Sequence, residues 1–348
     1  MEKLITLILC LLLSNTLLGG TDERQHTNVD TANYLDYYHA IAAAEEAVVN
    51  TDYANAVTQY QKIFKGYPYN NPIDCYIAAQ AASYIDDTAS CSDFLYKGLC
   101  FGLPVRTIAG NPHLKDCFQK MAQQTVDSCL NTYRQRIDQT ARARMLAISR
   151  YDQSFIQSLP IGEIYDYSAD SCRLKNKYQP VWDSLINEVV TLIRTSGFPA
   201  QRVIGTQDGV DSSFPLGPLS TFVLFVFVHH SNAWPLVSNL LWDELLKGNI
   251  TPQMYGVIYE SSNGKREYRT PINYFASRGC WQRKCKGLIK NHLREINEAR
   301  WSIGLGKYEV MDKKFESRIL YYKWRRKETR VKEPFFDFQC DLSFQRQP

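Results

Sequence analysis

The sequence predicts a mainly α-helical protein, with a short helical-repeat region on the N-terminal side and a second, mostly helical domain after it. Apolar residues recur at intervals of three and four along much of the chain, which is the spacing of one helix face. The 348 residues suggest two folded units, at about 150 residues for each domain. A hydrophobic fraction of 45% and a charged fraction of 22% are ordinary for a chain that buries a normal core.

The first segment, residues 1–20, has the composition of a secretory signal peptide. Lys3 precedes a continuous apolar run, and the small pair Gly19-Gly20 follows it. The run is about half the roughly 20 apolar residues that a membrane-spanning helix needs. We therefore expect an exported protein (periplasmic, cell-envelope or secreted) that is not transmembrane after cleavage. The polar residues 21–32 are expected to form a disordered leader.

Nine cysteines follow the signal segment, and export makes disulfides possible among them. Their odd number leaves at least one free or paired with another molecule. The pairing stays open, because sequence alone does not define it. No Cys-x-x-Cys pair or zinc-module spacing is present, so we expect no metal site. The nine are Cys75, Cys91, Cys100, Cys117, Cys129, Cys172, Cys280, Cys285 and Cys340.

Residues 33–148 have the pattern of a repeated helical pair. Between the break at Thr51-Asp52 and Pro68, one helix face is formed by four apolar residues, Ala56, Tyr60, Ile63 and Phe64. Small Ala56 permits close approach of a neighbouring helix. A weaker copy follows, with a first helix over 75–84, a turn at 86–87, a second helix over 88–101 and then Pro104. The two prolines are 36 residues apart.

This pattern resembles the tetratricopeptide repeat, whose period is about 34 residues. The resemblance implies stacked helical pairs with a concave groove for a protein or peptide partner. The alternative is a generic pair of helical hairpins. Residues 114–148 are expected to add one or two helices that cap the array, with five apolar residues on one face: Met121, Val126, Leu130, Tyr133 and Ile137.

The second domain is expected over residues 149–300. Apolar pairs at helical spacing end at Gly197-Phe198-Pro199, and an amphipathic helix is predicted over 234–247, followed by the start of another at 251–260. The continuously apolar run 222–228 is compatible with either a buried strand or a buried helix.

Charge is distributed unevenly along the chain. Residues 21–110 contain eleven acidic and five basic side chains, whereas residues 261–348 contain twenty-one basic and ten acidic ones. The basic extension 301–348 interleaves aromatic residues with its lysines and arginines, and 313–332 could contact an anionic surface. Export excludes nucleic acid as the expected partner. A solvated helix face is the simpler interpretation.

His229-His230 directly follows the apolar run and is the feature most open to a catalytic interpretation. A histidine at the edge of a core can act as a base or a ligand when a carboxylate sets its pKa. The structural alternative is that one ring bonds a backbone carbonyl and the other faces water.

Residues 145–270 resemble a family of uncharacterised, mostly bacterial domains. The matching features are Asp152-Gln153, the Gly197-Phe198-Pro199 ending, His229 and the Gly248-x-Ile250-x-Pro252 stretch. The resemblance implies that four residues converge on one pocket: Asp152, Gln153, His229 and Tyr268. The family has no established activity to transfer.

Common catalytic signatures, including Gly-x-Ser-x-Gly, His-Glu-x-x-His and a phosphate-binding glycine loop, are absent from the sequence. We therefore expect no cofactor. The leading hypothesis is a non-enzymatic protein-interaction or scaffold module of the cell envelope. The alternative is a hydrolase-like enzyme that uses His229 or His230 with Asp152.

Overall fold

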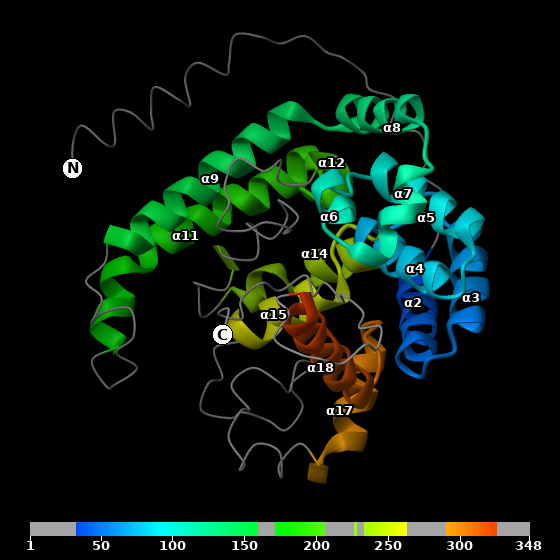
Figure 1. Ribbon diagram of the computed structural model, residues 1–348. Helices are drawn as coiled ribbons and strands as arrows, with labels where there is room; N and C mark the ends of the chain where they lie inside the picture. The colour runs from blue at the N-terminus through cyan, green and yellow to red at the C-terminus, as the bar shows by residue number, and fades with distance from the viewer. Residues whose placement is uncertain (1–32, 159–170, 206–225, 228–232, 263–289, 326–348) are drawn as a thin grey trace. The chain divides into compact units, whose positions relative to one another are not determined.

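The computed structural model describes residues 33–158, 171–205, 226–227, 233–262 and 290–325 (Figure 1). Every regular element in these ranges is a helix, which confirms the mainly α prediction. The described residues belong to one compact unit that begins at Asn33. The domain boundary at residue 148 stays a prediction. Among the described residues, no helix combines the length and the apolar character needed to cross a membrane.

In chain order the helices are α2 (Tyr34–Val49), α3 (Tyr53–Gly66), α4 (Pro72–Tyr84), α5 (Thr88–Cys100), α6 (Val105–Ala109), the 3₁₀ turn η1 (Pro112–Leu114), α7 (Lys115–Gln119), α8 (Gln123–Arg136), α9 (Gln139–Ser158), α11 (Ser171–Ser196), α12 (Gln201–Ile204), α14 (Trp234–Leu246), α15 (Pro252–Ser262), α17 (Leu293–Ser302) and α18 (Tyr308–Arg325).

The first four helices, α2 to α5, begin in the same way. Each follows an Asn or Asp whose side-chain oxygen accepts a hydrogen bond from a backbone N–H of the first turn. Such caps satisfy N–H groups that have no partner inside the helix. The capping residues are Asn33, Asp52, Asn71 and Asp87.

The two hairpin turns, between α2 and α3 and between α4 and α5, share one backbone motif. Thr51 and Asp86 adopt positive φ angles of 62° and 57°. In each turn the next residue, Asp52 or Asp87, donates its N–H to the carbonyl five residues earlier, at 2.9 and 3.0 Å. This bond satisfies a carbonyl at the helix end. The same turn therefore recurs 35 residues along the chain.

The two helical pairs stack on each other through equivalent helices. The first helices are joined by the Tyr37 hydroxyl, which donates to Asp74 Oδ2 at 2.8 Å. The second helices are joined by Gln61 Nε2, which donates to Ser90 Oγ at 2.8 Å. Figure 1 shows α2 to α5 side by side in the blue to cyan part of the chain. Consecutive helices of this region all contact one another.

A third layer continues this stack. The turn η1 packs against α4, and α8 packs against α5. The second helices α3, α5 and α8 end at Gly66, Cys100 and Arg136, at intervals of 34 and 36 residues. The first-helix position is occupied by the broken segment α6, η1 and α7. We infer three stacked layers, the last of which is irregular.

Residues 114–148 differ from the prediction of one or two helices with a continuous apolar face. The chain breaks twice, before α8 and again at Ile137-Asp138, where Asp138 caps α9. Met121 lies outside any helix, and Leu130 is only partly buried. The buried face of α8 is formed by Val126, Cys129 and Tyr133.

The later helices match the predicted positions. Helix α11 ends at Ser196, before Gly197, and α14 and α15 occupy the two segments predicted to be helical. Helix α9 packs against α11, α14 against α15, and α17 against α18. In the run 222–228, the described residues Val226 and Phe227 are helical and buried, and the remainder lies outside the described residues.

Candidate functional site

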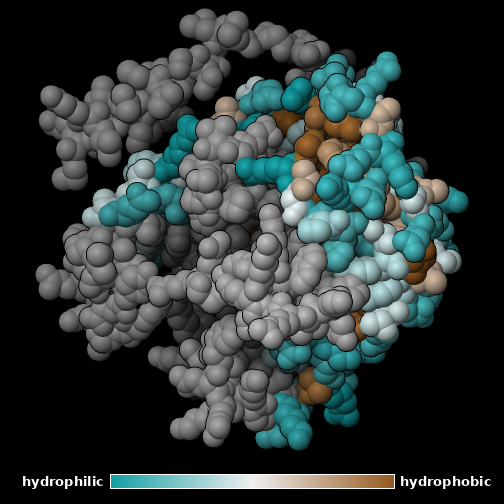
Figure 2. Space-filling model, viewed as in Figure 1, coloured by the Kyte–Doolittle hydropathy of each residue, from teal (hydrophilic) through white to brown (hydrophobic). Residues whose placement is uncertain are grey.

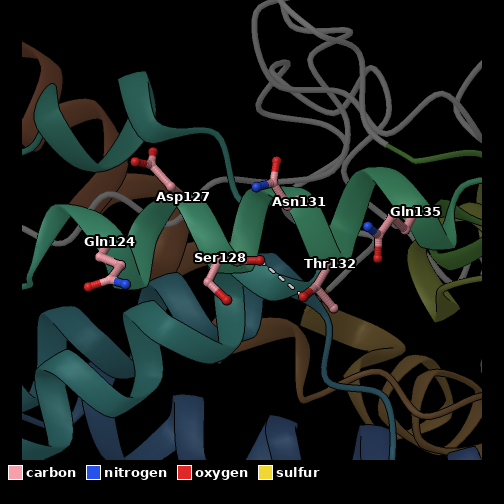
Figure 3. A pocket seen from close by; sticks show the side chains of 6 residues that line it. All are labelled: Gln124, Asp127, Ser128, Asn131, Thr132 and Gln135. Atoms are coloured by element: carbon pink, nitrogen blue, oxygen red, sulfur yellow. Dashed lines mark hydrogen bonds between the residues drawn. The ribbon is translucent and has the colours of Figure 1, made fainter.

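The outer side of α8 offers the candidate binding surface. A shallow hollow of about 430 Å³ runs along this helix, and its lining side chains are all polar and exposed. They stand along one side of the helix in Figure 3 and are Gln124, Asp127, Ser128, Asn131, Thr132 and Gln135. Their spacing of three and four residues is that of one helix face.

This surface provides hydrogen-bonding groups and little charge. Asp127 is the one ionisable residue among the six, and its Oδ1 accepts from Gln123 Nε2 at 3.0 Å. The Thr132 hydroxyl donates to the Ser128 backbone carbonyl at 3.0 Å (Figure 3). No histidine or cysteine is among the lining residues, so the hollow lacks a proton-transfer pair or a thiol nucleophile. Its chemistry suits recognition of a polar surface.

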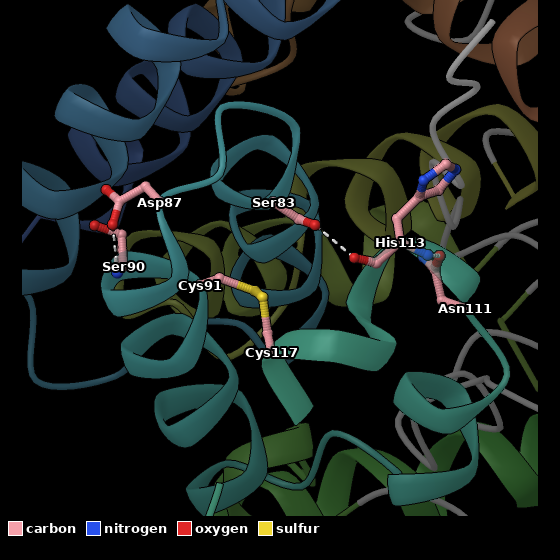
Figure 4. Close-up of a disulfide and its surroundings, with 7 residues drawn as sticks. All are labelled: Ser83, Asp87, Ser90, Cys91, Asn111, His113 and Cys117. Carbon is pink, nitrogen blue, oxygen red and sulfur yellow. Dashed lines mark hydrogen bonds between the residues drawn. A yellow bond between two sulfur atoms is a disulfide. The ribbon is translucent and has the colours of Figure 1, made fainter. Parts of the chain in front are cut away.

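Two cysteine pairs hold α8 and the preceding segment against α5. Cys91 is paired with Cys117 of α7, at a Cα–Cα distance of 6.2 Å (Figure 4). Cys100 is paired with Cys129 of α8, at a Cα–Cα distance of 4.4 Å. Both Cα separations are those of disulfides. Cys75 is a buried free cysteine of α4. The sequence predicted disulfides without their connectivity, and the structure supplies it for these four residues.

Asp152 and Gln153 lie in α9 and do contact each other. Gln153 Nε2 donates to Asp152 Oδ2 at 2.8 Å, and Asp152 is fully buried. A buried carboxylate that accepts hydrogen bonds is well suited to a structural role. The other predicted site residues, His229, His230 and Tyr268, lie outside the described residues. Their convergence with Asp152 stays a prediction.

A histidine cluster that sequence reasoning missed joins α4 to η1. The Tyr84 hydroxyl and His113 Nε2 are 3.1 Å apart. The Ser83 hydroxyl donates to the His113 backbone carbonyl at 2.5 Å (Figure 4). Burial lowers the pKa of His113 below its ordinary value. Because Ser83 bonds the carbonyl and not the imidazole, this arrangement does not activate a serine nucleophile.

One sequence signal could have located this cluster. Asn111 precedes Pro112-His113, and an Asn before a proline is a common start of a turn. In the structure the Asn111 side chain accepts from the His113 N–H at 3.0 Å and donates to the Tyr76 hydroxyl at 2.8 Å. Asn111 is fully buried. The cluster therefore fixes η1 on α4 and is best explained as packing.

The basic stretch 313–332 is described only through α18. Lys313 is exposed, whereas Lys314 forms a partly buried ion pair with Glu45 of α2 at 2.7 Å. Part of the positive charge that the sequence offers to an anionic surface is thus used inside the chain. The described residues contain no group of three or more His, Cys, Asp and Glu side chains placed to hold a metal ion.

The face of the molecule in Figure 2 is mainly hydrophilic over the described residues, and the hydrophobic colour is confined to small patches. A binding surface on this face is therefore expected to be polar. Comparison of the chain with protein-family models, curated proteins and solved structures finds no match.

Proposed function

We propose that this chain is an exported protein-interaction module built on tetratricopeptide-like helical pairs. The observation that carries the proposal is the recurrence of one hairpin turn, with its Asp cap, at Asp52 and Asp87. The third layer, which ends with α8, supports it, because repeat arrays usually need about three units for stability. Stacked helical pairs present extended surfaces that commonly bind protein partners.

Export is supported by the two cysteine pairs at disulfide distance, because disulfides persist in oxidising compartments. Both pairs join the last layer to α5, and the short helices of that layer bury few apolar side chains. In a reducing compartment this layer would lose both links to α5. The predicted signal segment and the structural use of these cysteines are therefore mutually consistent.

The surface proposed to bind a partner is the polar face of α8. It closes the stack, and its groups donate and accept hydrogen bonds without a strong charge. The partner that fits is a polar protein segment whose backbone or amide groups replace the water on this face. A purely apolar segment would leave these groups without hydrogen bonds at a cost of roughly 1–3 kcal/mol for each buried group.

The experiment places a photo-crosslinking amino acid on the native, oxidised protein in its own exported compartment. We expect a photo-crosslinker at position 128 or 131, in place of Ser128 or Asn131, to give one defined crosslinked protein band on a gel. Lys290 and Glu298, which are exposed on the other part of the chain, serve as control positions. Replacement of Asn131 and Thr132 by Arg should abolish the band without changing thermal unfolding. Equal labelling from test and control positions would exclude α8 as the partner surface.

A hydrolase-like enzyme that uses His229 or His230 with Asp152 remains the second hypothesis. Asp152 is buried and accepts a hydrogen bond from its neighbour Gln153, which favours a structural carboxylate over a catalytic one. If His229→Ala and His230→Ala leave folding and partner crosslinking unchanged, the enzyme hypothesis loses its main support.

A further inference from the structure

The two cysteine pairs differ in how far solvent reaches them. Cys91 and Cys117 are 0% and 4% exposed, so both residues of that pair are shielded (Figure 4). In the second pair Cys129 is 1% exposed, whereas its partner Cys100 is only partly buried. Of the four paired cysteines, Cys100 is therefore the one that a reagent in solution can approach.

Helix geometry explains this difference. Cys91 and Cys100 are nine residues apart in α5, and at about 100° for each residue they project from opposite sides of the helix. The Cys91 side faces α4, because an atom added at Gly98, about two turns later, would lie 3.2 Å from Cys75 Cβ. The Cys100 side carries Tyr96, which is 45% exposed. The first pair thus starts from the packed side of α5 and the second from its solvent side.

Access to sulfur controls how fast a disulfide is reduced, because a thiolate attacks one sulfur directly. At the second pair the accessible sulfur belongs to Cys100. Attack there joins the reagent to Cys100 as a mixed disulfide, and the Cys100–Cys129 bond breaks with its electron pair on the Cys129 sulfur. That thiolate takes up a proton from water. The Tyr96 carbonyl oxygen lies 3.6 Å from the Cys129 sulfur, where it can accept a hydrogen bond from the new S–H.

A second thiolate completes the exchange. It attacks the reagent's sulfur in the mixed disulfide and releases Cys100, which also takes up a proton. The balance is that two reagent thiols are oxidised to one disulfide and the Cys100–Cys129 pair is reduced to two thiols.

The free thiol of α4 is poorly suited to compete with a thiol from solution. Cys75 is fully buried, and burial raises the pKa of its thiol well above the ordinary value. The reactive thiolate form is therefore disfavoured. Cys75 also lies against Gly98, on the side of α5 that is opposite Cys100.

The bond made by Cys100 attaches the middle of α8 to α5. Helix α8 buries only three side chains, and Cys129 lies between the other two, Val126 and Tyr133. Tyr133 has a further anchor, because its ring packs so closely on Gly102 that an added Cβ there would overlap it. Reduction would therefore leave the C-terminal half of α8 held by Tyr133 and remove the covalent link from its first half.

We propose that Cys100 is a thiol-exchange site at which small thiols selectively reduce the Cys100–Cys129 pair. Its reduction loosens the first half of α8, while Cys91–Cys117 stays closed as a structural link. The site goes beyond the proposed function, because it needs no partner for α8. It adds redox control to the layer that carries the proposed binding surface.

The test exposes the full, oxidised chain at neutral pH to reduced glutathione. Samples taken over time are alkylated, digested and mapped by mass spectrometry. We expect a glutathione adduct on Cys100 and an alkylated Cys129 to appear first. The Cys100–Cys129 linkage should be lost on the order of tenfold faster than the Cys91–Cys117 linkage. Equal rates, faster loss of Cys91–Cys117, or an adduct on Cys129 in place of Cys100 would overturn the proposal.

Variants with a single pair form a matched set, because each lacks one disulfide. Cys91→Ala/Cys117→Ala keeps the accessible pair and should lose it as fast as the unmodified chain does. Cys100→Ala/Cys129→Ala keeps the shielded pair and should lose it slowly. Equal rates in these two variants, both folded, would show that exposure does not select the bond. Cys75→Ser should leave both rates of the unmodified chain unchanged, and a slower loss of Cys100–Cys129 would assign the attack to Cys75 and contradict the proposal.

Hydrogen exchange measures the structural consequence. After selective reduction, the backbone amides of residues 123–129 should exchange faster, whereas those of α4 should keep their protection. Unchanged exchange in α8 would contradict the loosening of this helix.

These results are separable from the proposed function. If glutathione attacks Cys100 selectively but α8 crosslinks no partner, the proposed function fails and the exchange site stands. If α8 crosslinks its partner but both cysteine pairs are reduced at one rate, the inference fails and the function stands.

Discussion

Tyr37 of α2 donates its hydroxyl hydrogen to Asp74 Oδ2 of α4 at 2.8 Å, so that the first helices of successive pairs are joined by a partly buried hydrogen bond. The same hydroxyl oxygen accepts from the Asn71 backbone N–H at 3.1 Å. Tyr37 is 1% exposed. Burial raises the pKa of its hydroxyl well above the ordinary value, so the group stays protonated and able to donate.

Tyr37→Phe should destabilise the stack, because it leaves the buried Asn71 N–H without its acceptor. We expect a loss of about 1–3 kcal/mol in the free energy of unfolding. Urea unfolding at neutral pH measures it. Tyr96→Phe is the matched control, since Tyr96 is 45% exposed on α5, and it should change stability by less than about 0.5 kcal/mol. Equal losses of stability in Tyr37→Phe and Tyr96→Phe would show that the hydrogen bonds of the Tyr37 hydroxyl do not hold the two helical pairs together.

The cysteine pairs should determine the stability of the third layer. They close intervals of 26 and 29 residues. Removal of either link is expected to cost about 2–4 kcal/mol. Thermal unfolding of Cys91→Ala/Cys117→Ala and of Cys100→Ala/Cys129→Ala measures these losses. Cys75→Ser tests whether the free cysteine contributes to the response to reductant.

Peptide mapping under non-reducing conditions checks the same pairing directly. We expect linked peptides that contain Cys91 with Cys117 and Cys100 with Cys129. In the unmodified chain, reductant should lower the thermal unfolding midpoint, and Cys75→Ser should show the same decrease. A linkage between Cys75 and any of these four residues would contradict the structure.

The fold was predictable where local chemistry decides it. The break predicted at Thr51-Asp52 and the turn predicted at 86–87 each precede an apolar helical pattern, and in the structure Asp52 and Asp87 cap the helices that begin there. The predicted face that includes Tyr60 and Phe64 is buried. The broken course of the segment before α8 was not predicted, because its short helices are held by the Cys91–Cys117 pair and by Asn111. Such long-range links leave no periodic signal.

The candidate surfaces were less predictable than the fold. The α8 face is polar at helical spacing, and that pattern is the same for any solvated helix. The pairing of Glu45 with Lys314 joins residues far apart in the chain. The sequence showed that residues 21–110 are acidic and residues 261–348 are basic. It did not show that the two segments come into contact. Asp152 and Gln153 were identified as neighbours from their order, whereas the burial of Asp152 depends on tertiary packing that the sequence does not show.

His113 should make stability fall at mildly acidic pH. Its pKa is lowered by burial, so the folded chain binds fewer protons at this site than the unfolded chain does. By linkage, this contribution is fully present above the ordinary pKa of about 6.5 and is lost as pH falls through the folded value. Unfolding midpoints in urea at pH 7.5, 6.5, 5.5 and 4.5 measure the trend.

His113→Gln should flatten that part of the pH profile, because glutamine does not titrate. His292→Gln is the control, since His292 stands at the start of α17 and contacts exposed Glu295. An unchanged profile in His113→Gln would exclude His113 as the group responsible.

Gly248 occupies a position that excludes any side chain for two separate reasons. Its φ of +72° is strained for other residues, and an added Cβ would overlap the ring of buried Tyr34. Gly197 has a similar φ of +80°, but nothing lies within 4 Å of its added Cβ. Gly197→Ala should therefore cost about 1–2 kcal/mol from backbone strain alone. Gly248→Ala should cost about 1–3 kcal/mol more, because the tightly packed ring must shift. Urea unfolding of the two variants separates these contributions. Equal losses would mean that Tyr34 does not pack against Gly248, and thus that α14 ends elsewhere than on the first helix of the stack.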